Sequence, residues 1–268
     1  MTATGGSGAQ QAPASPPTVP PTTADAPGSE AERRRELLQA LTTEHFTLQT
    51  ARSATISDSN GRSALYLSTV SSAVVALAFI GQVARVGEAF FLFALALLPA
   101  LVLLGVLTYL RLLQTAIEDL FYARAINRIR RHYVDIDPDA ARWFLLSGYD
   151  DPSGVMANMG LATQGAAPSH RHLLSHTASM VAVVTSIIGG VFVALVANAV
   201  GAGRLPVAAS ATVGIVVTLA SAAAFGWHQT RRWRDAENSV PSLFPSYQGR
   251  VSTPAVHPAI ADREQADN

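Results

Sequence analysis

The stretch AFFLFALALLPALVLLGVLTYL, residues 89–110, contains no charged side chain and decides the fold class. A helix needs roughly 20 residues to cross a hydrocarbon core of about 30 Å, so this stretch is long enough to span a membrane. Three further apolar runs, residues 63–84, 177–200 and 205–227, also meet this requirement. None of the four has the separate apolar and polar faces of a surface helix in a soluble protein. The sequence therefore predicts an all-α integral membrane protein with four transmembrane helices.

The composition agrees with this class and excludes several functions. Hydrophobic residues make up 49% of the chain and charged residues 14%, whereas a soluble domain carries about a quarter charged residues. The net charge is zero, so we expect no nucleic-acid partner. All 19 basic residues are arginine and there is no cysteine, which excludes lysine Schiff bases, phosphate-binding lysines, disulfides and thiolate chemistry. Residues 1–12 lack the charged and apolar regions of a cleavable signal peptide.

Arginine is distributed unevenly between the two sides of the predicted spans. The short connections around Arg85 and Arg204 carry one arginine each. The opposite flanks carry eleven: Arg52, Arg62, Arg111, Arg124, Arg128, Arg130, Arg131, Arg171, Arg231, Arg232 and Arg234. Because basic residues near span ends remain on the cytoplasmic side, we expect two membrane hairpins with both termini and the central loop in the cytoplasm.

The polar parts of the chain are predicted to form a cytoplasmic helical bundle between disordered termini. A capping box at Ser29–Glu32 starts an amphipathic helix, and nothing interrupts the helix after Leu110 until Asp137 and Pro138, which cap a new short helix. The predicted order is a disordered tail (1–28), an amphipathic helix (29–60), spans at 63–84 and 88–110, a helical extension (111–135), a short helix and loop (136–176), spans at 177–200 and 205–227, a second extension (228–238) and a disordered tail (239–268).

The stretch ARAINRIRRHY, residues 123–133, follows the second span and is rich in arginine. Four polar residues spaced i, i+3, i+4 and i+7 share one face of this predicted helix and form what we call the arginine stripe: Arg124, Asn127, Arg128 and Arg131. The stripe begins about 20 Å beyond Arg111 along a straight helix, and the Debye length in a cell is about 8 Å. Lipid headgroups are therefore not its expected partner.

Two interpretations of the arginine stripe remain open. In the first, the stripe is solvated or pairs with acidic residues of the first helix or of the segment that follows it: Glu32, Glu36 and Glu44, or Asp135, Asp137 and Asp139. In the second, the stripe lines a cleft in the bundle and binds a phosphate-bearing anionic small molecule or an acidic protein partner. The planar guanidinium group suits such oxyanions because it donates two parallel hydrogen bonds.

Small residues recur at every fourth position in three of the four spans. The rows are Ala64, Ser68, Ser72 and Ala76; Ala178, Ala182, Ser186, Gly190, Ala194 and Asn198; and Ser210, Gly214, Thr218, Ala222 and Gly226. Such rows let helix backbones approach closely, so Ser68, Ser72, Ser186, Gly190, Ala194, Gly214 and Thr218 are predicted to pack helices. They could pack within one chain, or one row could serve a homo-oligomer. The second span, rich in Leu and Phe, is expected to face lipid.

No motif for metal binding or catalysis stands out. His170, His172 and His176 cluster before the third span, but no carboxylate lies between the i, i+4 pair, so we expect neither a metal nor a cofactor. No ionisable side chain lies inside the spans, which disfavours proton-coupled transport. No nucleophile and base pattern is present either, and an enzyme is therefore not expected.

A cytoplasmic helix, the polar junction at residues 59–62, a membrane hairpin and the run NRIRRHYVDIDP (127–138) follow one another. In this order the chain resembles uncharacterised bacterial multi-span membrane proteins and, more loosely, small membrane effectors of nucleotide-signalled conflict systems. The resemblance implies a bacterial plasma membrane location and a ligand-sensing role. We expect a non-enzymatic protein that couples a cytoplasmic ligand or partner to its membrane bundle, as a homo-oligomer. The alternative is a channel or small-solute transporter with a pore lined by Ser, Thr and Asn of the first, third and fourth spans.

Overall fold

The computed structural model describes residues 27–83, 87–159, 177–201 and 206–246. The chain divides into two compact units, residues 1–43 and 44–268, and each is described by itself. Most of the two predicted disordered tails, and the three histidines before the third span, lie outside the described residues.

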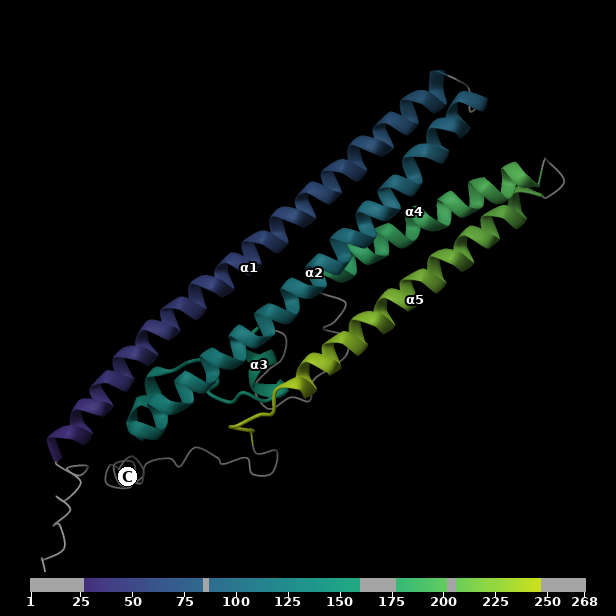
Figure 1. Ribbon diagram of the computed structural model, residues 1–268. Coiled ribbons are helices and arrows are strands. Elements are labelled where there is room, and N and C mark those ends of the chain that lie inside the picture. The colour runs from purple at the N-terminus through teal and green to yellow at the C-terminus, as the bar shows by residue number, and fades with distance from the viewer. Residues whose placement is uncertain (1–26, 84–86, 160–176, 202–205, 247–268) are drawn as a thin grey trace, which may run out of the picture. The chain divides into compact units, whose positions relative to one another are not determined.

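The described residues form helices and no strand. In chain order the helices are α1 (Pro27–Val83), α2 (Glu88–Ile136), the 3-10 helix η1 (Pro138–Trp143), α3 (Pro152–Asn158), α4 (Thr177–Val200) and α5 (Val207–Ser239) (Figure 1). Four of them, α1, α2, α4 and α5, are long and apolar enough to cross a membrane. The prediction of an all-α, multi-pass membrane protein with four spans is therefore confirmed.

Each predicted extension is continuous with its span. The amphipathic segment 29–60 and the first span form the single helix α1, and the polar junction at 59–62 does not interrupt it. The Arg62 Nε lies 2.8 Å from Asp58 Oδ2, an i, i+4 ion pair across this junction. Likewise, α2 runs through Pro99 and past Leu110 to Ile136, one residue beyond the predicted end. In the first unit, the described residues 27–43 form the start of α1.

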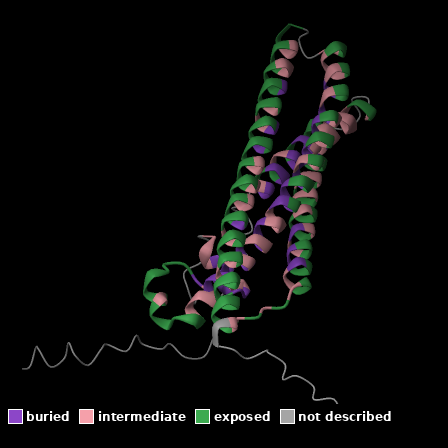
Figure 2. Cartoon of the chain, turned by 60° about the vertical axis from the view of Figure 1, so that its left-hand side comes forward, coloured by how far each residue is buried: buried purple, intermediate pink, exposed green. Residues whose placement is uncertain are grey.

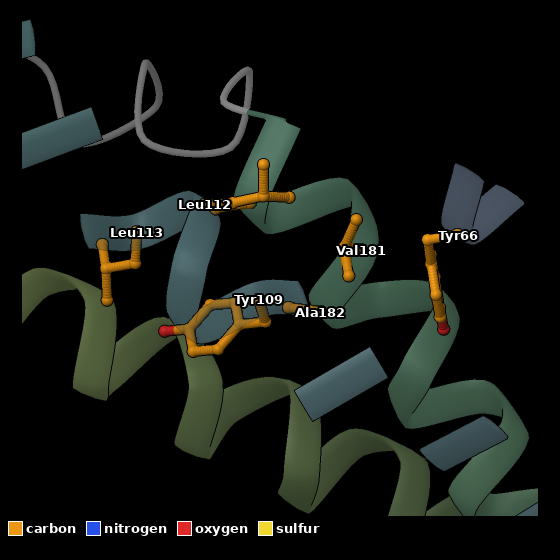
Figure 3. Close-up of a cluster of buried hydrophobic side chains, with 7 residues drawn as sticks. Tyr66, Tyr109, Leu112, Leu113, Val181 and Ala182 are labelled. Atoms are coloured by element: carbon orange, nitrogen blue, oxygen red, sulfur yellow. The ribbon is translucent and has the colours of Figure 1, made fainter. Parts of the chain in front are cut away.

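Helix α2 is the central helix of the second unit, because it contacts α4 along its span and packs against α1 as well. Tyr109 and Leu112 of α2 meet Val181 and Ala182 of α4 and Tyr66 of α1 in a buried cluster (Figure 3). The expectation that the second span faces lipid therefore holds for one face only: Leu103 and Leu107 are exposed, whereas Leu98 and Leu101 are buried. An all-round apolar helix can bury one face while the other stays exposed, and this composition cannot reveal which face is buried.

Helices α4 and α5 lie side by side and approach most closely at two glycines. A methyl group added at Gly190 would lie 2.5 Å from the Gly214 carbonyl oxygen, and one added at Gly214 would lie 2.7 Å from the Gly190 carbonyl oxygen. Ser186 is buried one turn earlier, and Ala194 and Thr218 also contact this crossing. The middle of the two predicted packing rows therefore lies at this crossing, whereas a methyl group added at Gly226, the last residue of the fourth-span row, would meet nothing within 4 Å.

The row on α1 differs from this pattern. Ser68 and Ser72 are exposed, and the buried positions of this part of α1 are instead Ser63, Tyr66 and Ala73. Of the two alternatives left open for this row, packing against another helix of the same chain therefore does not apply to Ser68 and Ser72. The bulkier Tyr66 faces the protein because its hydroxyl group reaches Thr185 Oγ1 on α4 at 2.9 Å. Figure 2 shows the same division along the helices, with one side buried and the other exposed.

Candidate functional site

The polar end of α2 carries a compact site made from four parts of the second unit. They are α2 itself, residues 147–151, α3, and the end of α5 with the residues that follow it. The chain turns back after Ile136 through η1, whose N-cap is Asp137: its carboxylate accepts a hydrogen bond from the Asp139 N–H at 3.0 Å, as predicted from the Asp-Pro pair. A second Asp-Pro pair starts α3, where Asp151 accepts from the Gly154 N–H at 2.9 Å. Both caps supply acceptors to otherwise unpaired N–H groups at a helix start.

Asn127 holds the returning chain against α2. Its side chain is 1% exposed and donates from Nδ2 to the Tyr149 carbonyl at 2.7 Å. Its Oδ1 accepts from Asn158 of α3 at 2.6 Å and from Arg130 at 3.2 Å. Arg130 and Asn158 both donate to the carbonyl of Ser147, at 2.8 Å and 3.0 Å. This network therefore orients residues 147–151 relative to the arginine stripe.

Arg124 caps the C-terminal end of α5. Its side chain is 3% exposed, and its Nη1 donates to the carbonyl oxygens of Val240 at 2.7 Å and Glu237 at 3.2 Å. The last carbonyl groups of a helix have no partner inside it and carry the negative end of the helix dipole, so a guanidinium group is stabilised there. Among the described residues, no carboxylate forms an ion pair with Arg124. Arg124 therefore joins α2 directly to the end of α5.

Asp150 and Arg128 bind the segment that follows α5. We call residues 240–246 the C-terminal segment. Asp150 is completely buried and accepts three hydrogen bonds, from Arg128 Nε at 2.7 Å and from the N–H groups of Leu243 at 2.9 Å and Phe244 at 2.7 Å. The Asp150 N–H returns a bond to the Phe244 carbonyl at 3.2 Å, and Arg128 Nη2 donates to the Pro241 carbonyl at 2.7 Å.

Asp151 extends this contact by two residues. Its Oδ2 accepts from the N–H of Ser246 at 2.9 Å and from the Ser246 hydroxyl group. The N-cap of α3 and the end of the C-terminal segment therefore share one carboxylate. We call Arg124, Asn127, Arg128, Arg130, Asp150 and Asp151 the polar cluster.

The electrostatics of the polar cluster follow from burial and from these contacts. Burial raises the pKa of Asp150, but the N–H groups of Leu243 and Phe244 together with Arg128 outweigh burial, so the pKa is lowered from its ordinary value. The carboxylate form is therefore the one that the folded protein stabilises. Burial, and secondly the charge of Arg52, lower the pKa of the Arg130 guanidinium group. Arg52 itself is paired with Asp119 of α2 at 2.8 Å, which links α1 to α2 outside the apolar part.

Arg131 is the one arginine of the stripe with no hydrogen bond to the C-terminal segment among the described residues. It pairs with Asp135 at 2.9 Å, four residues along the same helix, and its guanidinium carbon lies 5.8 Å from the centre of the Tyr149 ring. Asp135 was one of the acidic partners suggested by the sequence. The other three residues of the stripe bind parts of the chain that sequence reasoning did not select.

Sequence reasoning missed Asp150, Asp151 and the C-terminal segment. The Asp151-Pro152 pair has the same cap signature as Asp137-Pro138 and could have been interpreted as a helix start rather than as a turn. The prediction of a disordered tail from residue 239 does not hold for residues 239–246, because the polar cluster supplies the partners that their backbone groups need. No local signal could have indicated this, since Asp150 and Leu243 are 93 positions apart.

The polar cluster binds main-chain groups of the same chain. The polar cluster presents donors to carbonyl groups and acceptors to N–H groups, which is the chemistry of main-chain recognition. Across the described residues, no group of three His, Asp or Glu side chains is placed to hold a metal ion. Comparison of the chain with protein-family models, with curated proteins and with solved structures finds no match.

Proposed function

We propose that this chain is a non-enzymatic membrane protein that couples a ligand or partner at the polar cluster to its membrane helices. The proposal includes the bacterial plasma membrane as its location and both termini in the cytoplasm, as the arginine distribution favours. One observation carries it: α2 runs without interruption from Glu88, in the apolar part, to Ile136, beyond the polar cluster. A conformational change at the polar cluster would therefore act on a helix that also lies in the membrane.

Helix α5 supports the same proposal from the other side. Its end is capped by Arg124, and it continues back into the fourth span as one helix. An event at the polar cluster would thus reach two membrane helices, α2 and α5. These helices also meet in a buried cluster of Leu120, Ala123, Trp233 and Ala236, and the Tyr109 hydroxyl group donates to the Phe225 carbonyl at 2.9 Å. Because coupling needs a rigid element that both sites bias, these continuous helices are the physical basis of the proposal.

The chemistry of the polar cluster defines the class of ligand. Arg124 and Arg128 donate to carbonyl oxygens of the C-terminal segment, and an oxyanion offers the same acceptors with a full charge. The ligand that we propose is therefore a phosphate-bearing small molecule or an acidic protein segment, which competes with the C-terminal segment for these two arginines. A bound occupant that favours one arrangement shifts the population toward it.

A homo-oligomer is part of the proposal. Within one chain the small-residue rows of α4 and α5 are used at their crossing, whereas Ser68 and Ser72 on α1 remain exposed. This row is therefore available to a second copy, as small residues commonly are in helix association within membranes. Ser72→Leu should weaken oligomers in detergent, and Val74→Leu, at an exposed position on a different face of α1, should not. Equal oligomer distributions for both variants would remove this part of the proposal.

Coupling is tested with spin labels, which are easily placed because the chain has no cysteine. Leu103→Cys on α2 and Val213→Cys on α5, both exposed, carry the labels in full-length protein in lipid nanodiscs. In this background Arg128→Glu places a second negative charge beside Asp150 and should release the C-terminal segment. We expect the distance distribution between the labels to shift. Arg142→Glu is the control, because Arg142 is exposed and stacks on Trp143 away from the cluster.

A third label, at Leu243→Cys, reports whether the segment is released. An unchanged distance distribution together with a mobile segment would show that the cluster is not coupled to the membrane helices, and the proposal would fail. The ligand is sought by native mass spectrometry of the detergent-purified protein without any addition. A co-purified anion that is retained by the native chain and lost in Arg128→Glu supports the proposed ligand class.

A further inference from the structure

A groove of about 500 Å³ runs between α4 and α5 on the membrane part of the second unit. Its floor is formed by the small residues Gly190, Ala194 and Gly214, so few side-chain atoms project into it. Its walls are apolar side chains such as Val191 and Ile215. The only amide side chain in its lining is Asn198, near the end of α4.

The groove is polar at one end and apolar along the rest. Asn198 and Ser210 lie close to the ends of their helices, at Val200 and Val207, which is where a span meets the boundary of the membrane. Leu219 lines the opposite end, about 13 Å deeper along α5. Thr218 also lines this deep end, but its hydroxyl group is bonded to the Gly214 carbonyl and offers no free donor.

Ser210 has an unfilled donor at the polar end. It is 3% exposed, and its hydroxyl group has no hydrogen-bond partner among the described residues. The other hydroxyl groups of the fourth span bond to the carbonyl four residues earlier, as Thr212 does with Ala208. At Ser210 that carbonyl belongs to Pro206 and already accepts the N–H groups of Ala209 and Ser210. A buried donor without a partner is costly in an apolar environment, so an acceptor is expected there.

We propose that this groove binds one acyl chain of a glycerophospholipid from the surrounding bilayer, with the ester carbonyl accepting hydrogen bonds from Ser210 and Asn198. The order of polarity in the groove, polar at the membrane boundary and apolar toward the middle, is that of such a lipid. A transmembrane helix of a second copy would offer no free acceptor to Ser210, because its backbone carbonyl groups are bonded within the helix. The apolar walls do not fit a water-soluble ligand.

A larger side chain placed in the groove tests whether an acyl chain binds there. Ala211 lines the groove and is exposed, so Ala211→Phe closes it without entering the helix crossing. Ala220→Phe is the matched control, because Ala220 is also exposed on α5 and does not line the groove. The full chain is released from micelles containing dioleoyl phosphatidylglycerol and weighed by native mass spectrometry. We expect one retained lipid per chain in the native protein and in Ala220→Phe, and none in Ala211→Phe.

The proposed hydrogen bonds at the polar end of the groove are tested by changing the linkage of the lipid. A diether analogue of the same phospholipid lacks the ester carbonyl, so the native chain should prefer the diester by about three- to tenfold, the worth of one or two hydrogen bonds. Ser210→Ala should reduce this preference, and Thr212→Val should leave it unchanged because Thr212 is bonded within its own helix.

Three results would overturn the proposal. One is the absence of a retained lipid from the native chain. Another is equal lipid retention in the Ala211→Phe and Ala220→Phe variants. The third is a dimer that Ala211→Phe abolishes, since a second copy would then occupy the groove.

Discussion

Gly190→Ala is the sharpest test of the crossing between α4 and α5. The added methyl group would lie 2.5 Å from the Gly214 carbonyl oxygen, whereas ordinary van der Waals contact begins at 3.4 Å. It would also meet the Thr218 side chain, which can rotate away, but the Gly214 carbonyl is backbone and can move only with its helix. The two helices would have to separate by the difference, about 0.9 Å, at their closest point.

The neighbouring residue provides the matched control. A methyl group added at Gly189 finds Val102 Cγ2 at 3.9 Å, an ordinary contact, and nothing closer. Both substitutions recover the same helix propensity, up to about 1 kcal/mol, so this contribution cancels between them. Overpacking of a fitted contact costs about 1–3 kcal/mol, and this is the difference that we expect between the two variants. Gly190→Ala should therefore be less stable than Gly189→Ala by that amount.

The assay is unfolding in mixed micelles of increasing sodium dodecyl sulfate content, followed by the fluorescence of the three tryptophans, of which Trp227 and Trp233 lie on α5. The free energy of unfolding is compared between the two variants under identical lipid and detergent. Equal free energies would show that α4 and α5 do not approach each other at Gly190, and the packing derived for the two rows would be wrong.

Three other predictions concern separate parts of the chain. Because the pKa of Asp150 is lowered, the contacts of its carboxylate stabilise the fold fully above about pH 4 and are lost as the pH falls further. A spin label at Leu243→Cys should therefore become mobile only in that acidic range. Asp150→Asn should remove this transition. Gly61→Ala, where the added methyl group meets nothing within 4 Å, should raise the free energy of unfolding by about 0.5–1 kcal/mol in a thermal or detergent titration. Gly105→Ala would collide with Thr185 and should lower it by about 1–3 kcal/mol in the same titration.

The spans and the short helix after α2 could be predicted from local sequence, because length, hydropathy and the Asp137-Pro138 cap are local signals. The orientation of each span around its own axis could not. Leu98 is buried and Leu103 is exposed on the same helix, yet both are leucine in an apolar environment. In a membrane, lipid and protein are equally apolar, so hydrophobicity does not mark the face that packs. Close packing was indicated only by small residues, as at Gly190.

The arginine stripe was located correctly on one face of α2, but its partners were not. Helical spacing places Arg124 and Arg128 together, and no local pattern connects them to Val240 and Pro241, which are more than 100 positions away. Asp150 was overlooked because aspartates before a proline are common in turns. Its complete burial arises only when the C-terminal segment covers it, which is a property of the tertiary structure.

The bonds between Asp150 and the C-terminal segment have a consequence for biosynthesis. Residues 243 and 244 are translated after both α4 and α5, and they can reach Asp150 only from the side of the membrane on which Asp150 already lies. A chain in which only one of these two helices had inserted would carry the segment to the opposite side and leave the aspartate without its partners. Closure of the contact is therefore impossible for a nascent chain with only one of the two helices inserted. An antibody or protease that recognises the uncovered loop at residues 147–151 would detect such misinserted molecules.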